Sequence, residues 1–389
     1  MMTMRHFDFL SDADRQRLFF RAPEQFGAHD DGTLVAVGLG ATLYSPATRP
    51  ALAADIARRA AQGVTSVVVC LEDAVADVDL AAAEHNTLAQ LRRYARTGAA
   101  APLIFVRVRA AEQIPMIVAG LGEQVSVLAG FVLPKFTDLT GGTYLETVDA
   151  VSASIGRRLL VMPVLESPEI AFAESRIETL VAVRRLLEKY REYILAVRIG
   201  VTDLSATYAL RRSRDLTVYD VRVIADVIAD VVNVFARTGA GGYVVTGPVW
   251  EYFSGTERMF KPQLREGPFI AHAERTLRAE LIAHDLDGLI REVALDRANG
   301  LTGKSVIHPS HVAAVHALSV VTREEHADAQ DILGTRSGGG VACSPYRNKM
   351  NESKPHSAWA ERTLLRGRVF GVAHEGVSFV DLLGASLHQ

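Results

Sequence analysis

The sequence predicts an α/β protein whose eight parallel strands close into a (β/α)8 TIM barrel. Three observations point to this class. Short apolar runs recur along the chain, helical stretches separate most of them, and a polar residue follows most runs directly. An apolar run without alternation is typical of a strand buried on both faces, and strand–helix repetition favours right-handed parallel crossovers. Eight such strands are the number that closes a barrel.

The eight strands are expected where the apolar runs lie. A doubly wound open sheet is the competing fold, but it normally carries a glycine-rich phosphate turn, and neither GxGxxG nor GxxxxGK[ST] occurs in the chain. The barrel is therefore favoured. The expected strands are 34–43, 64–71, 103–106, 127–133, 159–165, 194–200, 243–245 and 305–307.

Helices are expected between the strands because apolar residues recur there at helical spacing. The chain also has stretches that stand outside the repeat. We expect an N-terminal extension over 1–32, a barrel over 33–320 with an insertion at 250–286, and a C-terminal linker and helical arm over 321–389, with a flexible break at 338–340. The expected helices are 51–62, 81–94, 170–190, 219–237, 287–298 and 356–369.

Composition excludes several classes of protein. With 49% hydrophobic and 22% charged residues the chain is not disordered, and a net charge of −3 gives it no basic field for nucleic acid. Two cysteines, Cys70 and Cys343, cannot build a disulfide scaffold. The first residues show no signal peptide and no window is apolar enough to span a membrane, so a cytoplasmic protein is expected.

Polar residues gather at one end of the predicted strands. In a barrel the carboxyl ends of the strands meet at one rim, where the chemistry of this fold takes place. Ionisable groups at that rim must be solvated, paired or metal-bound. The residues at or just past six strand ends are Glu72 and Asp73, Arg107, Lys135, Glu166, Asp203 and His308.

Two of these acids indicate a metal. Glu166 and Asp203 follow neighbouring strands, and two carboxylates that leave water positions open suit Mg²⁺ or Mn²⁺. Such an ion would stabilise an enolate, and Arg107 would neutralise the same oxyanion. The alternative is that both acids only form salt bridges with Arg107 and Lys135.

Six short segments then resemble the HpcH/HpaI aldolase and citrate-lyase β-subunit superfamily, in family order. Within it the chain is most similar to the branch called C–C bond lyase of the TIM-barrel fold, found with tellurite-resistance and stress-response gene clusters. The segments are VCLEDAV (69–75), FVRV (105–108), LPK (133–135), VLESP (164–168), IGVTDL (199–204) and GKSVIHP (303–309). The segment 349–372 resembles the arm that such lyases pack across a neighbouring subunit's site.

The resemblance implies a Mg²⁺-dependent lyase or aldolase acting on a 2-oxo acid or acyl-CoA-type substrate, and a homo-oligomer. It assigns metal binding to Glu166 and Asp203 and substrate or enolate contact to Arg107, and it places Glu72 and Asp73 in the pocket. We expect a reversible aldol or Claisen cleavage in which Asp73 or a metal-ordered water is the base.

Departures from the family pattern bear on the substrate. Cys70 stands where the family usually has Asp, and we expect it to be a buried strand residue. Arg109 replaces a small polar residue and would suit a phosphorylated or dianionic substrate. Tyr44 and Arg49, after the first strand, are further candidates for substrate contact.

Other functions stay open. Lys135 could form a Schiff base in a metal-independent aldolase, although the acids around it would raise its pKa. His308 could be a general acid or base, or a structural hydrogen-bonding group. The basic run 211–214 could receive a phosphate or CoA group or be a solvated helix end. Finally, the barrel could be a non-catalytic binding or scaffold component of a stress-response pathway.

Overall fold

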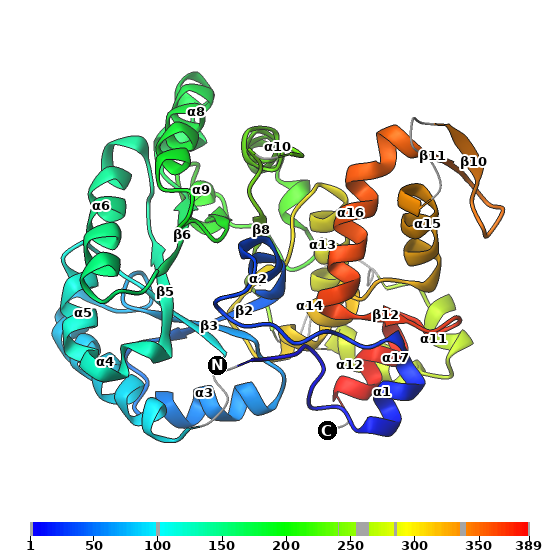
Figure 1. Ribbon diagram of the computed structural model, residues 1–389, viewed down its shortest axis with the longest axis horizontal. Helices are drawn as coiled ribbons and strands as arrows, with labels where there is room; N and C mark the ends of the chain where they lie inside the picture. The colour runs from blue at the N-terminus through cyan, green and yellow to red at the C-terminus, as the bar shows by residue number, and fades with distance from the viewer. Residues whose placement is uncertain are drawn as a thin grey trace.

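A computed structural model confirms the closed eight-stranded parallel barrel (Figure 1). It describes residues 3–98, 102–239, 241–253, 264–283, 286–334 and 340–387. The barrel strands pair in chain order and close between the first and the last, where Thr42 lies opposite Ser305. The strands are β2 (Ala41–Pro46), β3 (Ser66–Cys70), β4 (Leu103–Arg107), β5 (Leu128–Leu133), β6 (Leu160–Leu165), β7 (Val197–Ile199), β8 (Val245–Trp250) and β9 (Lys304–Val306).

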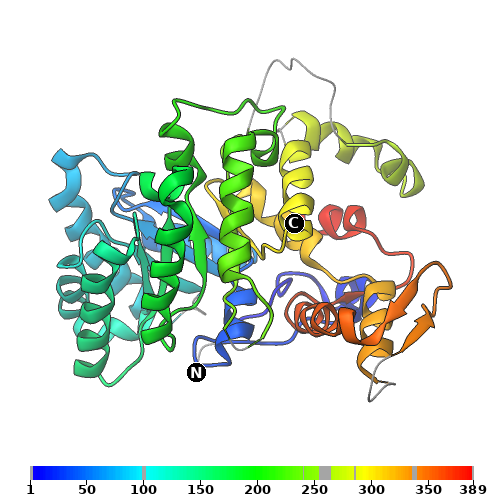
Figure 2. The same cartoon turned by 90° about the horizontal axis from the view of Figure 1, so that it is seen from above.

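Helices cover the outside of the barrel (Figure 2). Their inner faces carry fully buried residues such as Leu91, Leu187 and Val231, so burial of apolar surface joins the two layers. Most lie where helical spacing predicts them. The helices between the barrel strands are α3 (Leu52–Ala61), α4 (Leu80–Arg96), α5 (Gln113–Leu121), α6 (Asp138–Ser154), α7 (Pro168–Ala171), α8 (Ala173–Lys189), α9 (Val201–Ala206), α10 (Arg222–Phe235), α11 (Gly267–Ala271), α12 (Arg275–Ala283) and α13 (Leu286–Ala298), with short 3₁₀ turns at Asp77–Asp79, Gly122–Val127 and Val218–Asp220.

The expected first strand, 34–43, is wrong over most of its length. Its apolar run forms helix α2 (Gly32–Gly38), and the strand β2 begins only at Ala41. Asp31 caps the helix, since its carboxylate accepts hydrogen bonds from the backbone N–H groups of Thr33 (3.0 Å) and Leu34 (3.1 Å). Periodicity cannot separate a buried helix from a buried strand when a short run is apolar on all sides.

The expected seventh strand, 243–245, is too short and lies too early. Strand β8 runs to Trp250 and contains Gly247 and Pro248, which resemble the start of a turn in the sequence. Its pairing with β9 shifts register between Gly247 and Trp250. Such an irregularity accommodates a proline that cannot donate to the ladder. The next part of the predicted insertion falls partly on 254–263 and 284–285, outside the described residues.

The two ends of the chain pack together beside the barrel, on the right of Figure 1. Strand β1 (Phe19–Arg21) pairs antiparallel with β12 (Val372–Ala373), which joins the predicted N-terminal extension to the C-terminal arm. The predicted break at 338–340 falls mostly outside the described residues. The remaining elements here are α1 (Asp12–Leu18), α14 (Ser310–Ser319), α15 (Arg323–Gly334), β10 (Val341–Cys343), β11 (Met350–Glu352), α16 (Ser353–Phe370) and α17 (Phe379–Leu387).

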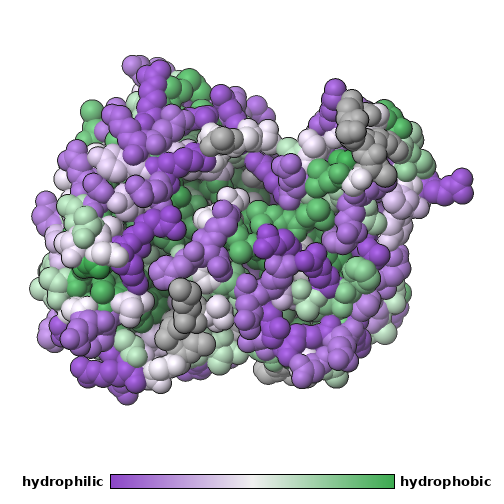
Figure 3. Space-filling model, in the orientation of Figure 1, coloured by the Kyte–Doolittle hydropathy of each residue, from purple (hydrophilic) through white to green (hydrophobic). Residues whose placement is uncertain are grey.

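Helix α16 lies over the amino-terminal end of its own barrel. Arg362 on this helix donates to the carbonyl of Ala236 (2.7 Å), and together with α2 and α13 the helix borders a groove of about 880 Å³. The face drawn in Figure 3 is hollowed near its centre, where apolar side chains show between polar ones. Since catalytic groups of this fold lie at the opposite, carboxyl-terminal end, the arm leaves its own strand ends uncovered by this contact. No described helix is long and apolar enough to cross a membrane.

Candidate active site

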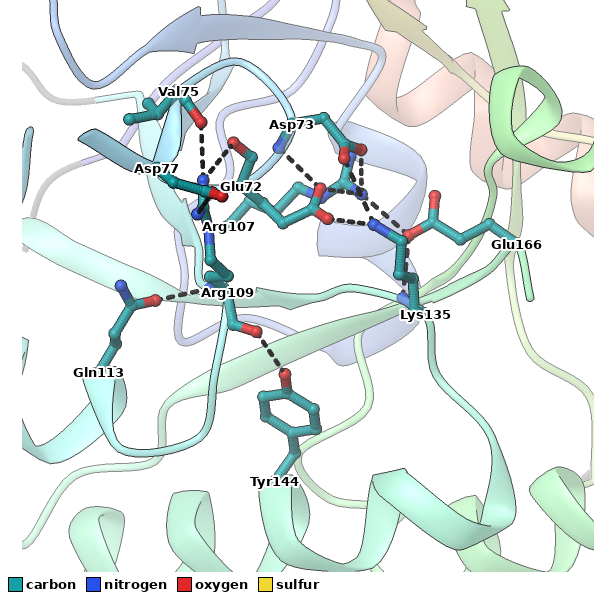
Figure 4. Close-up of polar contacts among 10 residues, drawn as sticks. All are labelled: Glu72, Asp73, Val75, Asp77, Arg107, Arg109, Gln113, Lys135, Tyr144 and Glu166. Carbon is teal, nitrogen blue, oxygen red and sulfur yellow. Dashed lines mark hydrogen bonds and ion pairs between the residues drawn. The ribbon is translucent and has the colours of Figure 1, made fainter. Parts of the chain in front are cut away.

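Charged side chains at the ends of β3, β4, β5 and β6 come together at the carboxyl-terminal rim (Figure 4), and Asp203, which follows β7, lies close enough to interact with them. Each residue ends a strand or lies within four residues after one, so parallel alignment of the strands places the set at one end of the barrel. Glu72 and Glu166 are buried, whereas the side chain of Asp73 is half exposed. The set comprises Glu72 and Asp73 after β3, Arg107 at the end of β4, Lys135 after β5, Glu166 after β6 and Asp203 in the first turn of α9.

Arg107 is the centre of this set. Its Nη2 lies 2.6 Å from Glu72 Oε2, 3.1 Å from Asp73 Oδ2 and 2.9 Å from Glu166 Oε1. The side chain is only 11% exposed, and Nε has no hydrogen-bond partner among the described residues. Although burial opposes the charged form, the charges of Glu166 and Glu72 hold the pKa of Arg107 above its usual value. Arg107 therefore provides a permanently charged hydrogen-bond donor at the bottom of the charged set.

Glu166 is held from two sides. Its Oε1 accepts hydrogen bonds from the backbone N–H of Lys135 (2.9 Å) and from Arg107. Gly200, at the end of β7, leaves room for the carboxylate, because a Cβ there would overlap Glu166 Oε2. Burial first, and then the charge of Asp203, raise the pKa of Glu166 to about 7. Burial and the charge of Asp73 also raise the pKa of Asp203.

Lys135 is ion-paired. Its Nζ contacts Glu72 Oε1 and lies 3.3 Å from Asp73 Oδ1. Partial burial disfavours the ammonium, but the hydrogen bond and charge of Glu72 and the charge of Asp73 hold the pKa of Lys135 above its usual value. A Schiff base needs a neutral amine, so this arrangement opposes that alternative. Of the salt bridges weighed from the sequence, the one between Glu166 and Arg107 is present, while Lys135 pairs with Glu72 and Asp73.

The net negative charge of the set favours the binding of a divalent cation. Four carboxyl groups (Glu72, Asp73, Glu166, Asp203) face two cations (Arg107, Lys135), so with every group ionised 4 − 2 leaves an excess of two negative charges. Among the described residues no three His, Cys, Asp or Glu side chains converge to hold a metal by themselves. Mg²⁺ commonly uses one or two carboxylates and completes its shell with water and substrate. The oxygen donors of Glu166 and Asp203 fit that ion.

Of the other residues predicted at the site, Tyr44 lies near this set, whereas Arg49 and His308 contact other residues. Tyr44 on β2 is close enough to feel the charges of Arg107 and Glu166. Arg49 pairs with Asp55 (3.2 Å) and is half exposed. His308 stacks on Phe253, with ring centres 4.6 Å apart, and its Nδ1 lies 2.7 Å from Ser310 Oγ.

Arg109 holds the loop after β3. Its guanidinium donates to Asp77 Oδ1 (2.5 Å) and to the carbonyl of Val75 (2.7 Å), and the phenol of Tyr144 donates to the Arg109 carbonyl (3.1 Å). This loop follows Glu72 and Asp73 directly. Arg109 therefore helps to fix the loop that carries these two acids, and its contact with a substrate stays a prediction.

Two other sequence candidates have structural partners. Arg212, in the basic run 211–214, pairs with Glu292, donates to the carbonyl of Val249 (2.6 Å) and packs over Trp250. It is therefore not a solvated helix end. Cys70 is buried, as expected, and burial raises the pKa of its thiol.

Sequence reasoning missed two residues of the site. Gly200 makes space for Glu166, and Arg198 on β7 points into the barrel beneath the rim. A signal was present for the second one. An arginine inside the apolar run ILAVRIG is unusual, because burying a charge in a strand is costly.

A closed (β/α)8 barrel with a carboxylate–arginine set at its carboxyl-terminal rim defines a barrel enzyme. A model of the family described as C–C bond lyase of the TIM-barrel fold matches residues 33–372, and the chain belongs to this family of carbon–carbon lyases. None of the curated proteins matches the chain.

Several solved structures are similar to it. Malate synthase of Haloferax volcanii in a magnesium and glyoxylate complex is 15% identical, with a TM-score of 0.52 over 74% of this chain and 75% of that one. The CitE protein of Mycobacterium tuberculosis in complex with magnesium, acetoacetate and coenzyme A is 19% identical, with a TM-score of 0.49 over 84% and 97%. RipC of Yersinia pestis is 16% identical, with a TM-score of 0.46 over 73% and 95%.

Proposed function

We propose that this protein is a Mg²⁺- or Mn²⁺-dependent lyase that cleaves or forms a carbon–carbon bond through the enolate of a 2-oxo acid or acyl-CoA-type substrate. The observation that carries the proposal is the juxtaposition of Glu166 and Asp203 beside a buried Arg107 that hydrogen-bonds Glu166. Two carboxylates that repel each other suit a divalent cation. That cation, together with the neighbouring guanidinium of Arg107, would stabilise a developing oxyanion.

The residues divide the work by their chemistry. Glu166 and Asp203 would hold the ion, which when bound supplies positive charge beside the enolate. Arg107 binds the substrate carboxylate or the enolate oxygen through guanidinium N–H groups. Lys135 and Glu72 hold Arg107 and Asp73 in place by ion pairing.

The cleavage needs one base. Asp73 is half exposed, and although burial acts in the opposite direction, its hydrogen bond to Glu72 and the charge of Arg107 hold its pKa below the usual value. Its carboxylate takes the hydroxyl proton of the departing fragment, the C–C bond breaks, and the electron pair of that bond becomes the enolate. A proton then returns to the enolate carbon. In the reverse direction the same steps form the bond.

Hydrogen–deuterium exchange at the methyl group of pyruvate, and separately of acetyl-CoA, tests the shared half-reaction by proton NMR. We expect exchange with Mg²⁺, none with EDTA, and a loss of at least 100-fold in Glu166→Gln. Glu169→Gln is the matched control, since Glu169 lies three residues further on and is exposed.

The possible results separate the alternatives. Exchange that persists in EDTA and is trapped on Lys135 by borohydride would replace the proposal with a Schiff-base aldolase. No exchange with either donor, together with no Mn²⁺ binding, would leave the non-catalytic scaffold.

A further inference from the structure

A fully buried arginine lies inside the barrel without a carboxylate partner. Arg198 on β7 is 1% exposed, and its guanidinium reaches Ser305 Oγ (2.7 Å), Thr42 Oγ1 (3.4 Å) and Met162 Sδ (3.4 Å). All three partners are neutral, and Nε has none. No ion pair of Arg198 occurs among the residues that the structure describes. An unpaired buried charge is costly, so its retention in the barrel core calls for a compensating interaction.

That interaction is with Tyr44. The Cζ atom of the guanidinium lies over the Tyr44 ring, 5.5 Å from its centre. Side chains two residues apart point to the same face of a strand, so Tyr44 lies one layer above Thr42, which contacts Arg198. The register Pro46–Cys70–Arg107 places the rim one layer higher again. Tyr44 is thus the link between the buried cation and the rim.

The hydroxyl proton of Tyr44 needs an acceptor other than the two nearby arginines. Arg198 lies over the Tyr44 ring, and a guanidinium can only donate, so it cannot accept the phenol proton. Arg107, the other cation that acts on Tyr44, cannot accept that proton either. The carboxylate of Glu166 is one acceptor close to Tyr44, and an oxygen of a bound ligand would be another.

We propose that Tyr44 donates a hydrogen bond to the enolate oxygen of the substrate, and that Arg198 is the positioning residue that orients the phenol for this contact. The inference rests on the proposed function, since it concerns the oxygen on which negative charge develops. The positive charge of Arg198, held against the ring of Tyr44, would strengthen the hydrogen bond that the phenol donates to that oxygen. The ligand class selected is a planar oxyanion lying directly over the Tyr44 hydroxyl.

Oxalate, a planar dianion that resembles the enolate of pyruvate, probes this contact without requiring turnover. Calorimetry with Mg²⁺ measures its affinity for the full chain, for Tyr44→Phe, for Arg198→Met and for the double variant. We expect Tyr44→Phe to weaken binding about tenfold, as for a hydrogen bond to a charged group. Because Arg198 acts through Tyr44, the double variant should bind no more weakly than the weaker single variant.

A second measurement separates ligand contact from folding. In protein labelled with 3-fluorotyrosine, the ¹⁹F resonance that Tyr44→Phe deletes should shift on addition of oxalate and in Arg198→Met. Tyr193→Phe is the matched control: it too loses a phenol hydrogen bond, the 2.6 Å contact with Asp149 on α6, and should leave oxalate affinity unchanged. Tyr44→Phe keeps the three other partners of Arg198, so it tests the contact even where Arg198→Met does not fold.

The outcomes are distinguishable. Equal oxalate affinity of the parent and Tyr44→Phe, with an unmoved Tyr44 resonance, would overturn this inference and leave the proposed function intact. Additive losses in the double variant would overturn the positioning role of Arg198. No Mg²⁺-dependent oxalate binding by the parent would overturn the proposed function and this inference with it.

Discussion

The backbone N–H of Lys135 donates a 2.9 Å hydrogen bond to Glu166 Oε1, and Lys135 adopts a left-handed φ of 46°. This conformation is sterically unfavourable for a residue other than glycine. The bend at the end of β5 aims the amide at the carboxylate while the side chain turns back to Glu72. One residue thereby orients a carboxylate with its main chain and neutralises another with its side chain.

Lys135→Met separates these two functions. The backbone bond to Glu166 stays, while one positive charge disappears, so Mn²⁺ binding should persist or tighten because the excess negative charge grows. Electron paramagnetic resonance of free Mn²⁺ measures this affinity. A loss of metal binding in Lys135→Met would mean that the ammonium, and not the amide, orders the carboxylates.

Asp203→Asn should weaken Mn²⁺ binding at least tenfold. An amide oxygen carries no net charge, and in the proposed site Asp203 is one of the two carboxylates that would bind the hard cation. The same titration measures it, with Asp226→Asn as control, because Asp226 forms a surface pair with Arg222 on α10. Equal affinity of Asp203→Asn and the parent would exclude Asp203 as a ligand.

Gly200→Ala should disable the site without a charge change. The added methyl overlaps Glu166 Oε2 and lies 2.6 Å from its Cβ, so the carboxylate must move. We expect Mn²⁺ affinity to fall at least tenfold and stability to fall by about 1–3 kcal/mol. Gly142→Ala is the control: nothing lies near its Cβ on α6, and it should gain about 0.5–1 kcal/mol. Normal metal binding by Gly200→Ala would show that the carboxylate has another position.

Lys304→Met should destabilise the fold strongly. Lys304 Nζ lies 2.9 Å from Glu292 Oε1 and 2.6 Å from Asp296 Oδ2, and all three side chains are buried between β9 and α13. Removing the cation leaves buried carboxylates unpaired, which costs about 3–5 kcal/mol in urea unfolding. Arg222→Ala, which breaks an exposed pair, should change stability by less than about 0.5 kcal/mol. A small effect of Lys304→Met would mean that Asp296, whose pKa burial raises to about 6, takes up a proton instead.

Stability should fall in mild acid because two histidines are buried as neutral rings. His316 Nε2 accepts from the backbone N–H of Ala41 (3.1 Å), the ring of His6 is 4.5 Å away, and burial lowers the pKa of His316 to about 3. Burial and then the neighbouring ring also lower the pKa of His6.

The direction in which stability changes with pH follows from proton uptake. In the unfolded chain both rings bind a proton near pH 6.5, while the folded protein excludes it, so stability is full above pH 6.5 and falls as the pH drops toward 3, by about 1.4 kcal/mol per pH unit for each ring. Calorimetric unfolding between pH 7 and 4 measures this, with His85→Gln, an exposed position, as control. His316→Gln should flatten the dependence. An unchanged slope in that variant would place the acid sensitivity elsewhere.

The sequence alone determined the barrel fold and which charged residues lie at the rim of the barrel. Near-continuous apolar runs between helical stretches fix parallel strands, and a charged residue at the end of such a run must lie at the rim, as Glu72, Arg107 and Glu166 do. Local pattern suffices there because strand direction and burial are properties of each segment.

Only the tertiary structure decided what depends on neighbours far apart in the chain. In the folded protein the apolar run before Ala41 is a helix, and strand β8 continues past Pro248. Lys135 forms an ion pair with Glu72, and Arg107 forms one with Glu166. The tertiary structure also placed Arg198 beneath Tyr44, 154 positions earlier in the sequence. Ion-pair choice and the cost of a buried charge are set by distances across the barrel, and no local pattern records those distances.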